Sequence, residues 1–123
     1  MLIDDNRADN YYHERVIRNN DSADIIIAKE SAEDGLAYLK TGEGTQPDII
    51  FLDINMPGMN GWEFLEEYHL LDKQLQSKVT IVMLTTSANP DDKAKAGTFD
   101  SLLDFLVKPL SAEQLDRIIG SFF

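Results

Sequence analysis

Several short apolar runs in this sequence end in residues that could do chemistry together. Asp4 and Asp5 end the first run, Asp53 ends another, Thr85 a further one, and Lys108 the last. In an open sheet of parallel strands, ligands bind beyond the carboxyl ends of the strands, so we expect these side chains to meet at one edge. One carboxylate there can act as a nucleophile and become an aspartyl phosphate, while an ammonium and a hydroxyl contact the phosphoryl oxygens.

The three carboxylates of this predicted edge, from Asp4, Asp5 and Asp53, are expected to need a cation. Two carboxylates about 5 Å apart repel each other by roughly 3 kcal/mol at an effective dielectric constant of about 20. Three in one shallow site would raise one another's pKa unless a positive charge neutralises them. Oxygen ligands without His or Cys select a hard cation, in a cell Mg²⁺, which keeps open positions for a phosphoryl group.

The apolar runs that carry these residues are continuous and rich in β-branched residues. This pattern is typical of parallel strands covered on both faces. The predicted strands cover residues 2–3, 25–28, 49–52, 79–84 and 105–107. The first is short beside the usual length of about 5–6 residues.

The segments between and after these strands have helical spacing and helix-start signals. The predicted helices begin after Asn6, Ser31, Asn60, Asn89 and Ser111. Asn60 with Glu63 has the spacing of a capping box, and Pro90 fits the first position of a helix. The β-α unit is therefore repeated five times, which predicts an α/β domain with a parallel sheet and helices on both faces.

The composition limits the possible partners. There are 11 Lys and Arg residues against 22 Asp and Glu, a formal net charge of −11, which disfavours binding to nucleic acid or to an anionic membrane surface. The absence of Cys excludes a disulfide scaffold, a thiolate metal site and a Cys nucleophile. No apolar run approaches the roughly 18 residues that span a bilayer, and no signal peptide opens the sequence, so we expect a cytoplasmic location.

Four segments resemble the bacterial response-regulator receiver domain of the CheY-like kind. They are Asp4-Asp5, Asp53-Ile-Asn-Met-Pro-Gly-Met-Asn-Gly61, Leu84-Thr85-Thr86-Ser87 and Lys108-Pro109, in order over essentially the whole chain. The resemblance implies a five-stranded parallel sheet flanked by helices on both faces, with the flavodoxin-like strand order 2-1-3-4-5. It also implies one receiver domain over residues 1–123, with no effector domain.

The resemblance assigns roles around the acidic cluster. Asp53 matches the phosphoacceptor, which receives phosphate from a phosphohistidine on a sensor histidine kinase or phosphotransfer protein. Asp5 matches a direct ligand of Mg²⁺ and Asp4 a ligand that acts through water. Asn55 matches the residue whose backbone carbonyl completes the Mg²⁺ shell.

Further roles concern the switch. Thr85 matches the hydroxyl that moves onto the phosphoryl group, and Phe105, which stands where many members have Tyr, matches the aromatic that turns inward. Lys108 matches the ion-pair partner of the phosphoacceptor, and its bond to Pro109 is expected to be cis. The stretch from Thr85 to Lys108 is one residue longer than usual, with the insertion near residues 97–100. Counting back from Lys108 would select Thr86, but Thr85 fits the strand end.

The predicted function is a phosphorylation-controlled switch whose own chemistry is limited to self-phosphorylation and self-dephosphorylation at Asp53. Output is expected through contact with a downstream protein that the sequence does not identify. Asn55 and Ser87 match positions that modulate loss of phosphate, and neither predicts unusually fast dephosphorylation.

Two alternatives to the switch stay open. One is an aspartyl-nucleophile phosphatase, which needs a second acid two residues after the nucleophile, where this sequence has Asn55. The other is a degenerate receiver, a binding module that never takes phosphate. The intact acidic set with Thr85 and Lys108 argues against the second alternative.

Overall fold

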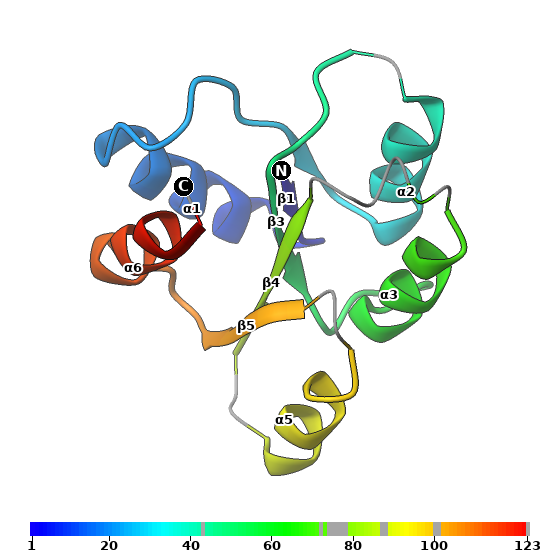
Figure 1. Cartoon of the computed structure of the whole chain (residues 1–123). Coiled ribbons are helices and arrows are strands. Elements are labelled where there is room, and N and C mark those ends of the chain that lie inside the picture. Colours follow the sequence, from blue (N-terminus) through cyan, green and yellow to red (C-terminus); the bar gives the residue numbers. More distant parts are fainter. Residues whose placement is uncertain (43, 72, 74–78, 87–88, 100–101, 123) are drawn as a thin grey trace.

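The computed structural model describes residues 1–42, 44–71, 73, 79–86, 89–99 and 102–122. In these residues five parallel strands form one sheet with the order β2-β1-β3-β4-β5 (Figure 1). The strands are β1 (Leu2–Ile3), β2 (Ala28–Lys29), β3 (Ile49–Asp53), β4 (Thr80–Thr85) and β5 (Leu102–Val107). The predicted α/β class and strand order 2-1-3-4-5 are confirmed.

Five helices in the same residues flank the sheet: α1 (Arg7–Asn19), α2 (Ala32–Thr41), α3 (Gly61–His69), α5 (Pro90–Ala96) and α6 (Ala112–Phe122). Their starts are those that the sequence predicts. Asn60 and Glu63 form the expected capping box, and Ser111 caps the backbone of Gln114 while the Gln114 side chain accepts from the Ser111 N–H. Within the described part of the chain, none of the helices has the length and apolar character needed to cross a membrane.

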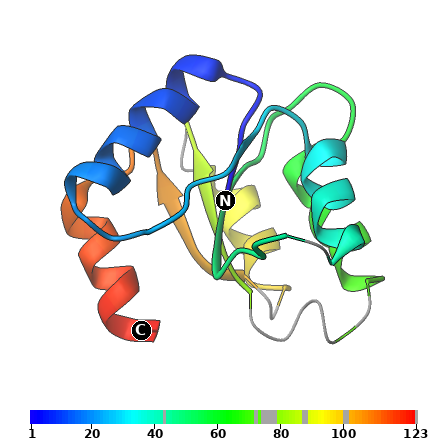
Figure 2. The ribbon, with the colours of Figure 1, turned by 90° about the horizontal axis from the view of Figure 1, so that it is seen from above.

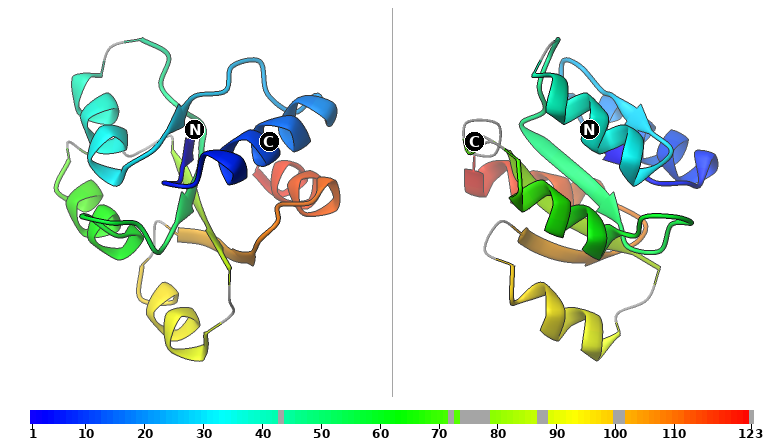
Figure 3. Two further views of the ribbon diagram at one scale, coloured as in Figure 1. Left: turned by 180° about the vertical axis from the view of Figure 1, so that it is seen from behind. Right: turned by 90° about the vertical axis from the view of Figure 1, so that its right-hand side faces the viewer.

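The two faces of the sheet carry separate cores. Helices α1 and α6 lie on one face, and α2, α3 and α5 lie on the other, as the views in Figures 2 and 3 show. Neighbouring strand residues point to opposite faces, so Leu2 packs under α1 and α6 while Ile3 packs under α2 and α3. This two-sided burial explains why the strands are continuous apolar runs rather than alternating ones.

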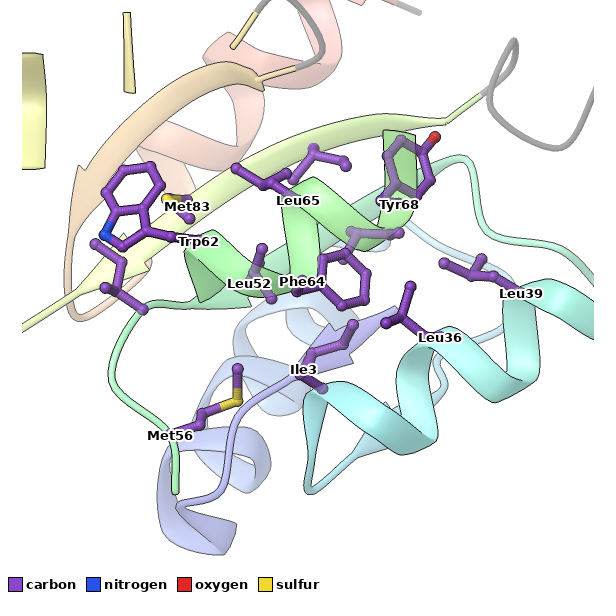
Figure 4. Packing of buried hydrophobic residues seen from close by; sticks show 14 of the residues in the cluster. Ile3, Leu36, Leu39, Leu52, Met56, Trp62, Phe64, Leu65, Tyr68 and Met83 are labelled. Atoms are coloured by element: carbon purple, nitrogen blue, oxygen red, sulfur yellow. The ribbon is translucent and has the colours of Figure 1, made fainter. Parts of the chain in front are cut away.

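The core beneath α2 and α3 is dense at its centre. Phe64 and Leu65 of α3 are fully buried, and Phe64 lies near Ile3 of β1 and Leu36 of α2 (Figure 4). Burying a side chain of this size contributes about 1.5–3 kcal/mol. The core therefore fixes α3, and with it the loop that joins α3 to β3, against the sheet.

The predicted bounds of the second strand are wrong. The strand is Ala28–Lys29 rather than 25–28, and Ile25 is 59% exposed. The cause is the short neighbour: β1 has only two residues, and their partners in the ladder are Ala28 and Lys29. A strand residue needs a paired neighbour, and an apolar run alone does not supply one.

The fifth strand is longer than predicted. It begins at Leu102 rather than at residue 105, because Leu102 already pairs with Ile81 of β4. The register shifts between Ile81 and Val82, so an irregularity separates the pairing of Leu102 from that of Asp104 to Val107. No periodic pattern in the sequence indicates such a shift. The predicted insertion near residues 97–100 includes Asp100, which lies outside the described residues.

Candidate functional site

The polar residues that end the strands meet at the carboxyl edge of the sheet. Asp4 follows β1, Asp53 is the last residue of β3, Thr85 is the last residue of β4, and Lys108 follows β5. Since β1, β3, β4 and β5 are successive neighbours in the sheet, their ends lie side by side. Carboxylate oxygens of Asp4, Asp5 and Asp53 lie within 4.8 Å of one another. The predicted convergence is therefore present.

Lys108 is the positive charge at the centre of this cluster. Its Nζ lies 2.6 Å from Asp4 Oδ2, 2.9 Å from Asp9 Oδ2 and 3.4 Å from Asp53 Oδ1, and its side chain is only 9% exposed. Burial disfavours the ammonium, but the hydrogen bonds to Asp4 and Asp9 outweigh burial and raise the pKa of Lys108 above its usual value. The lysine therefore stays charged.

Asp53 is a buried carboxyl whose ionised form is disfavoured. Burial raises its pKa to about 6, the negative charge of Asp4 acts in the same direction, and Lys108 opposes both. The Lys108 contact is the longest of the three that the ammonium makes, so its compensation is partial. The negative charge of Asp53 is therefore only partly compensated, although the carboxyl is largely ionised near neutral pH.

The donor set fits a hard cation. Both oxygens of Asp4 already accept hydrogen bonds, one from Lys108 and the other, at 3.0 Å, from the Asn6 N–H. Asp5 is exposed at the same edge. Direct ligation by Asp5 and Asp53, with Asp4 acting through water, suits this arrangement and Mg²⁺, which keeps several of its waters. A cation would also relieve the electrostatic strain on Asp53.

The loop from Asp53 to α3 is held by close backbone packing. The Gly61 N–H donates to the Ile54 carbonyl at 2.8 Å, and a Cβ at Gly61 would lie 2.6 Å from the Asp53 carbonyl oxygen. On the outer side, Glu33 of α2 accepts a hydrogen bond from the Met59 N–H at 3.1 Å. Asn55 is exposed in this loop, directly after the β3 end, where a backbone carbonyl can reach a cation at the edge.

The proposed switch residues lie on the two strands beyond β3. Thr85 is buried at the end of β4, whereas Thr86 is exposed after the strand, which favours Thr85 as the functional hydroxyl. The Lys108 N–H donates to the Thr85 carbonyl at 2.6 Å, so the two strand ends are directly joined. Phe105 of β5 is partly buried against the core on the α3 side. The Lys108–Pro109 bond is cis, as expected; Ser87 lies outside the described residues.

Two residues of α1 at this site carry no role in the sequence analysis. Asp9 binds Lys108, and the buried Asn10 donates from Nδ2 to the Asp4 carbonyl at 2.8 Å. Asp9 lies in the first turn after the Asn6 cap. Acidic residues are common there because they stabilise the helix N-terminus, so the sequence position of Asp9 did not indicate a role in the site. Its pairing with a residue 99 positions away follows only from the fold.

One hollow in the described part of the chain lies away from the acidic cluster. A hollow of about 370 Å³ is lined by residues that include Met1, Asp48 and Ile49, which lie at the amino ends of β1 and β3. It is therefore at the end of the sheet away from the carboxylates. Within the acidic cluster, Asp5 is exposed to solvent, whereas Asp4 and Asp53 are buried.

Comparisons of sequence point to one family. A family model described as the response regulator receiver domain matches residues 1–120. The chain is 33% identical over 90 residues to the transcriptional regulatory protein HptR of Staphylococcus aureus (strain N315), a match that covers 73% of this chain and 33% of that protein. An uncharacterized response regulatory protein of Vibrio cholerae is 40% identical over 85 residues, a match that covers 69% of this chain and 30% of that protein. The chain spans about a third of the length of these curated relatives.

Solved structures agree. A two-component response regulator from Cytophaga hutchinsonii superposes with a TM-score of 0.91 at 31% identity, covering 98% of this chain and 92% of the other. A CheY-like receiver domain protein from Methanospirillum hungatei JF-1 has a TM-score of 0.76 at 30% identity, covering 99% and 90%. The chemotaxis protein CheY4 of Vibrio cholerae, at 23% identity, has a TM-score of 0.80, covers 99% and 95%, and supports the fold alone.

Proposed function

The chain belongs to the response regulator receiver domain family, and we propose that it is a switch controlled by phosphorylation of Asp53. One observation carries the proposal: carboxylates from two strand ends and one buried ammonium share the same edge of the sheet. The oxygens of Asp4, Asp5 and Asp53 lie within 4.8 Å of one another, and Lys108 contacts two of these residues. Phosphoryl transfer depends mainly on this kind of positioning and charge neutralisation.

In the proposed reaction, a carboxylate oxygen of Asp53 attacks the phosphorus of a phosphohistidine on a histidine kinase or phosphotransfer protein. An O–P bond forms while the N–P bond breaks, and the electron pair of that bond stays on the imidazole nitrogen. Asp53 needs no base, because it is largely ionised above its pKa of about 6. Asp5, Asp53 and the Asn55 carbonyl would hold Mg²⁺, with Asp4 acting through water, and the bound ion would supply charge neutralisation at the phosphoryl oxygens.

The same residues would convert the added charge into a change of shape. Lys108 donates to one phosphoryl oxygen and the Thr85 hydroxyl to another, so both side chains are drawn toward Asp53. Phe105 turns inward into the space that the threonine leaves. Because the Lys108 N–H is bonded to the Thr85 carbonyl, the ends of β4 and β5 respond together. This shift favours a surface that a partner recognises.

This proposal places the chain in the cytoplasm as a signalling component rather than a metabolic enzyme. Its upstream partner is a histidine kinase or phosphotransfer protein, and its output is a contact with a downstream protein. The net charge of −11 argues against direct contact with nucleic acid or a membrane surface. The Staphylococcus aureus relative is named a transcriptional regulatory protein, but the match covers only 33% of it. We therefore do not extend that role to this chain.

Intact-mass measurement after incubation with acetyl phosphate and Mg²⁺ tests the proposal. Wild type is expected to gain one phosphoryl group and Asp53→Asn none; chelation of Mg²⁺ abolishes the gain. Asp48→Asn is the matched control, because Asp48 is an exposed acid outside the cluster, before the first residue of the same strand, and it is expected to behave like wild type.

Other outcomes identify the alternatives. Failure of the wild-type protein to gain one phosphoryl mass would favour the degenerate receiver, a binding module that does not take phosphate. Sustained Mg²⁺-dependent hydrolysis of a generic phosphomonoester identifies a phosphatase. Equal gain by wild type and Asp53→Asn removes Asp53 from its role.

A further inference from the structure

Lys108 has a third acidic partner, Asp9, which comes from a helix rather than from a strand end. Asp9 lies in the first turn of α1, where the Asn6 side chain caps its N–H. Its Oδ2 lies 2.9 Å from Lys108 Nζ, closer than the 3.4 Å between Lys108 Nζ and Asp53 Oδ1. Charge-assisted hydrogen bonds of this kind are about 2.7–2.9 Å long, so Asp4 and Asp9 hold the lysine and Asp53 has only a loose ion pair.

We propose that Asp9 is a positioning residue that holds Lys108 toward α1 and so limits how readily the ammonium reaches a phosphoryl group on Asp53. This inference rests on the proposed function and names a residue that regulates the same site. An ammonium has three N–H donors, and two of them are directed to Asp4 and Asp9. The third donor is available, but Nζ lies 3.4 Å from Asp53 Oδ1. To bring the ammonium closer to a phosphoryl group on Asp53, Lys108 lengthens one of its two shorter bonds.

Burial decides which of the two bonds is lengthened. The Asp4 side chain is 6% exposed, whereas the Asp9 side chain is 34% exposed. If Lys108 moves away from Asp9, water can take its place. If Lys108 moves away from Asp4, a buried carboxylate is left without its cation. Asp9 is therefore the partner that Lys108 leaves. Because the Asp9 side chain is partly exposed, solvent screens its ion pair with Lys108, so the expected effect on the rate is a few-fold.

The test measures phosphorylation by acetyl phosphate at saturating Mg²⁺, as a function of acetyl phosphate concentration. Asp9→Ala is expected to raise the maximal rate constant about two- to fivefold, because Lys108 no longer has to leave Asp9. Asp9→Asn keeps a weaker, neutral acceptor, so its maximal rate constant is expected to lie between those of wild type and Asp9→Ala. Asp9→Glu is expected to return the rate toward the wild-type value.

A control separates positioning from net charge. Glu14→Gln removes one negative charge from the same helix, where Glu14 pairs with Arg18 and does not contact the lysine. A general charge effect improves the apparent affinity for the anionic donor equally in both variants and leaves the maximal rate unchanged. Thermal unfolding without Mg²⁺ checks that each variant is folded.

The outcomes distinguish this inference from the proposed function. If wild type accepts a phosphoryl group and folded Asp9→Ala has the same maximal rate as Glu14→Gln, or a lower one, the role of Asp9 is overturned while the switch stands. If wild type accepts no phosphoryl group, the proposed function fails first, and the role of Asp9 fails with it. A raised maximal rate confined to the Asp9 variants supports the inference.

Discussion

Asp53 is held in a protein environment that favours its neutral form. Burial and the Asp4 charge raise its pKa from 3.8 to about 6, despite the nearby Lys108. Because the folded-state pKa is above the unfolded value, the folded protein binds this proton more tightly than the unfolded chain does. The resulting destabilisation is absent below about pH 4, grows as the pH rises through the interval up to about 6, and is complete above it.

We expect Asp53→Asn to stabilise the metal-free protein at neutral pH, because the amide removes a carboxylate that is costly to ionise. The rise of the pKa from 3.8 to about 6 corresponds to roughly 3 kcal/mol. This net value already includes the favourable Lys108 contact, so we expect a gain of up to about 3 kcal/mol. Urea unfolding of both proteins between pH 5 and 8, without divalent cations, measures this difference in the free energy of unfolding. Identical pH profiles for wild type and Asp53→Asn would show that Asp53 has no raised pKa in the folded state.

Lys108 is expected to matter for stability as well as for chemistry. Lys108→Met leaves the buried carboxylates of Asp4 and Asp53 without their cation, and breaking such a buried pair costs about 3–5 kcal/mol. We expect the free energy of unfolding at pH 7.5 to fall by about that amount and to recover in part with Mg²⁺ or at low pH. Denaturant titrations with and without Mg²⁺ measure this, and a variant as stable as wild type in both conditions would contradict the electrostatic account.

At the scale of elements, β3 and α3 together position the phosphoacceptor. The first residue of α3, Gly61, packs directly on the backbone that follows Asp53, and its N–H is bonded to Ile54. The fully buried Phe64 and Leu65 hold α3 in this place from the core side. The geometry of the acidic edge therefore depends on how closely a helix approaches a strand end.

Gly61→Ala tests this dependence. The added Cβ would lie 2.6 Å from the Asp53 carbonyl oxygen and 2.9 Å from Ile54 Cα, so α3 has to move, at an expected cost of about 1–3 kcal/mol. Gly120→Ala is the control, because a Cβ there meets nothing within 4 Å, and it is expected to be neutral or slightly stabilising. Thermal unfolding compares the two. A Gly61→Ala protein as stable as Gly120→Ala would show that the close approach is unimportant.

The elements also show what the sequence can predict. Capping residues such as Asn60 and Ser111 act within three or four positions, so local sequence is enough to locate the helix starts. The bounds of β2 and β5 depend on pairing with strands elsewhere in the chain, namely with the two residues of β1 and across the register shift in β4. The contact of Asp9 with Lys108 is of the same non-local kind.

For the whole molecule, the repeated β-α unit predicts where function lies before any side chain is placed. Polar residues after apolar runs are brought together by the order of the parallel strands, which is why Asp4, Asp53 and Lys108 could be grouped from sequence. What the sequence could not show is how one ammonium is shared. The order of its distances to Asp4, Asp9 and Asp53 is set by the packing of α1 on the sheet.

The proposed switch requires that the carboxyl edge of the sheet binds Mg²⁺ and a phosphoryl group on Asp53. A crystal structure with Mg²⁺ and beryllofluoride, a stable mimic of the phosphoryl group, tests it most directly. We expect beryllium bonded to an Asp53 carboxylate oxygen, fluorides contacted by Lys108 Nζ and the Thr85 hydroxyl, and Mg²⁺ beside Asp5. Density for the anion at another place, or an Asp53 carboxylate that stays bare under saturating conditions, would contradict it.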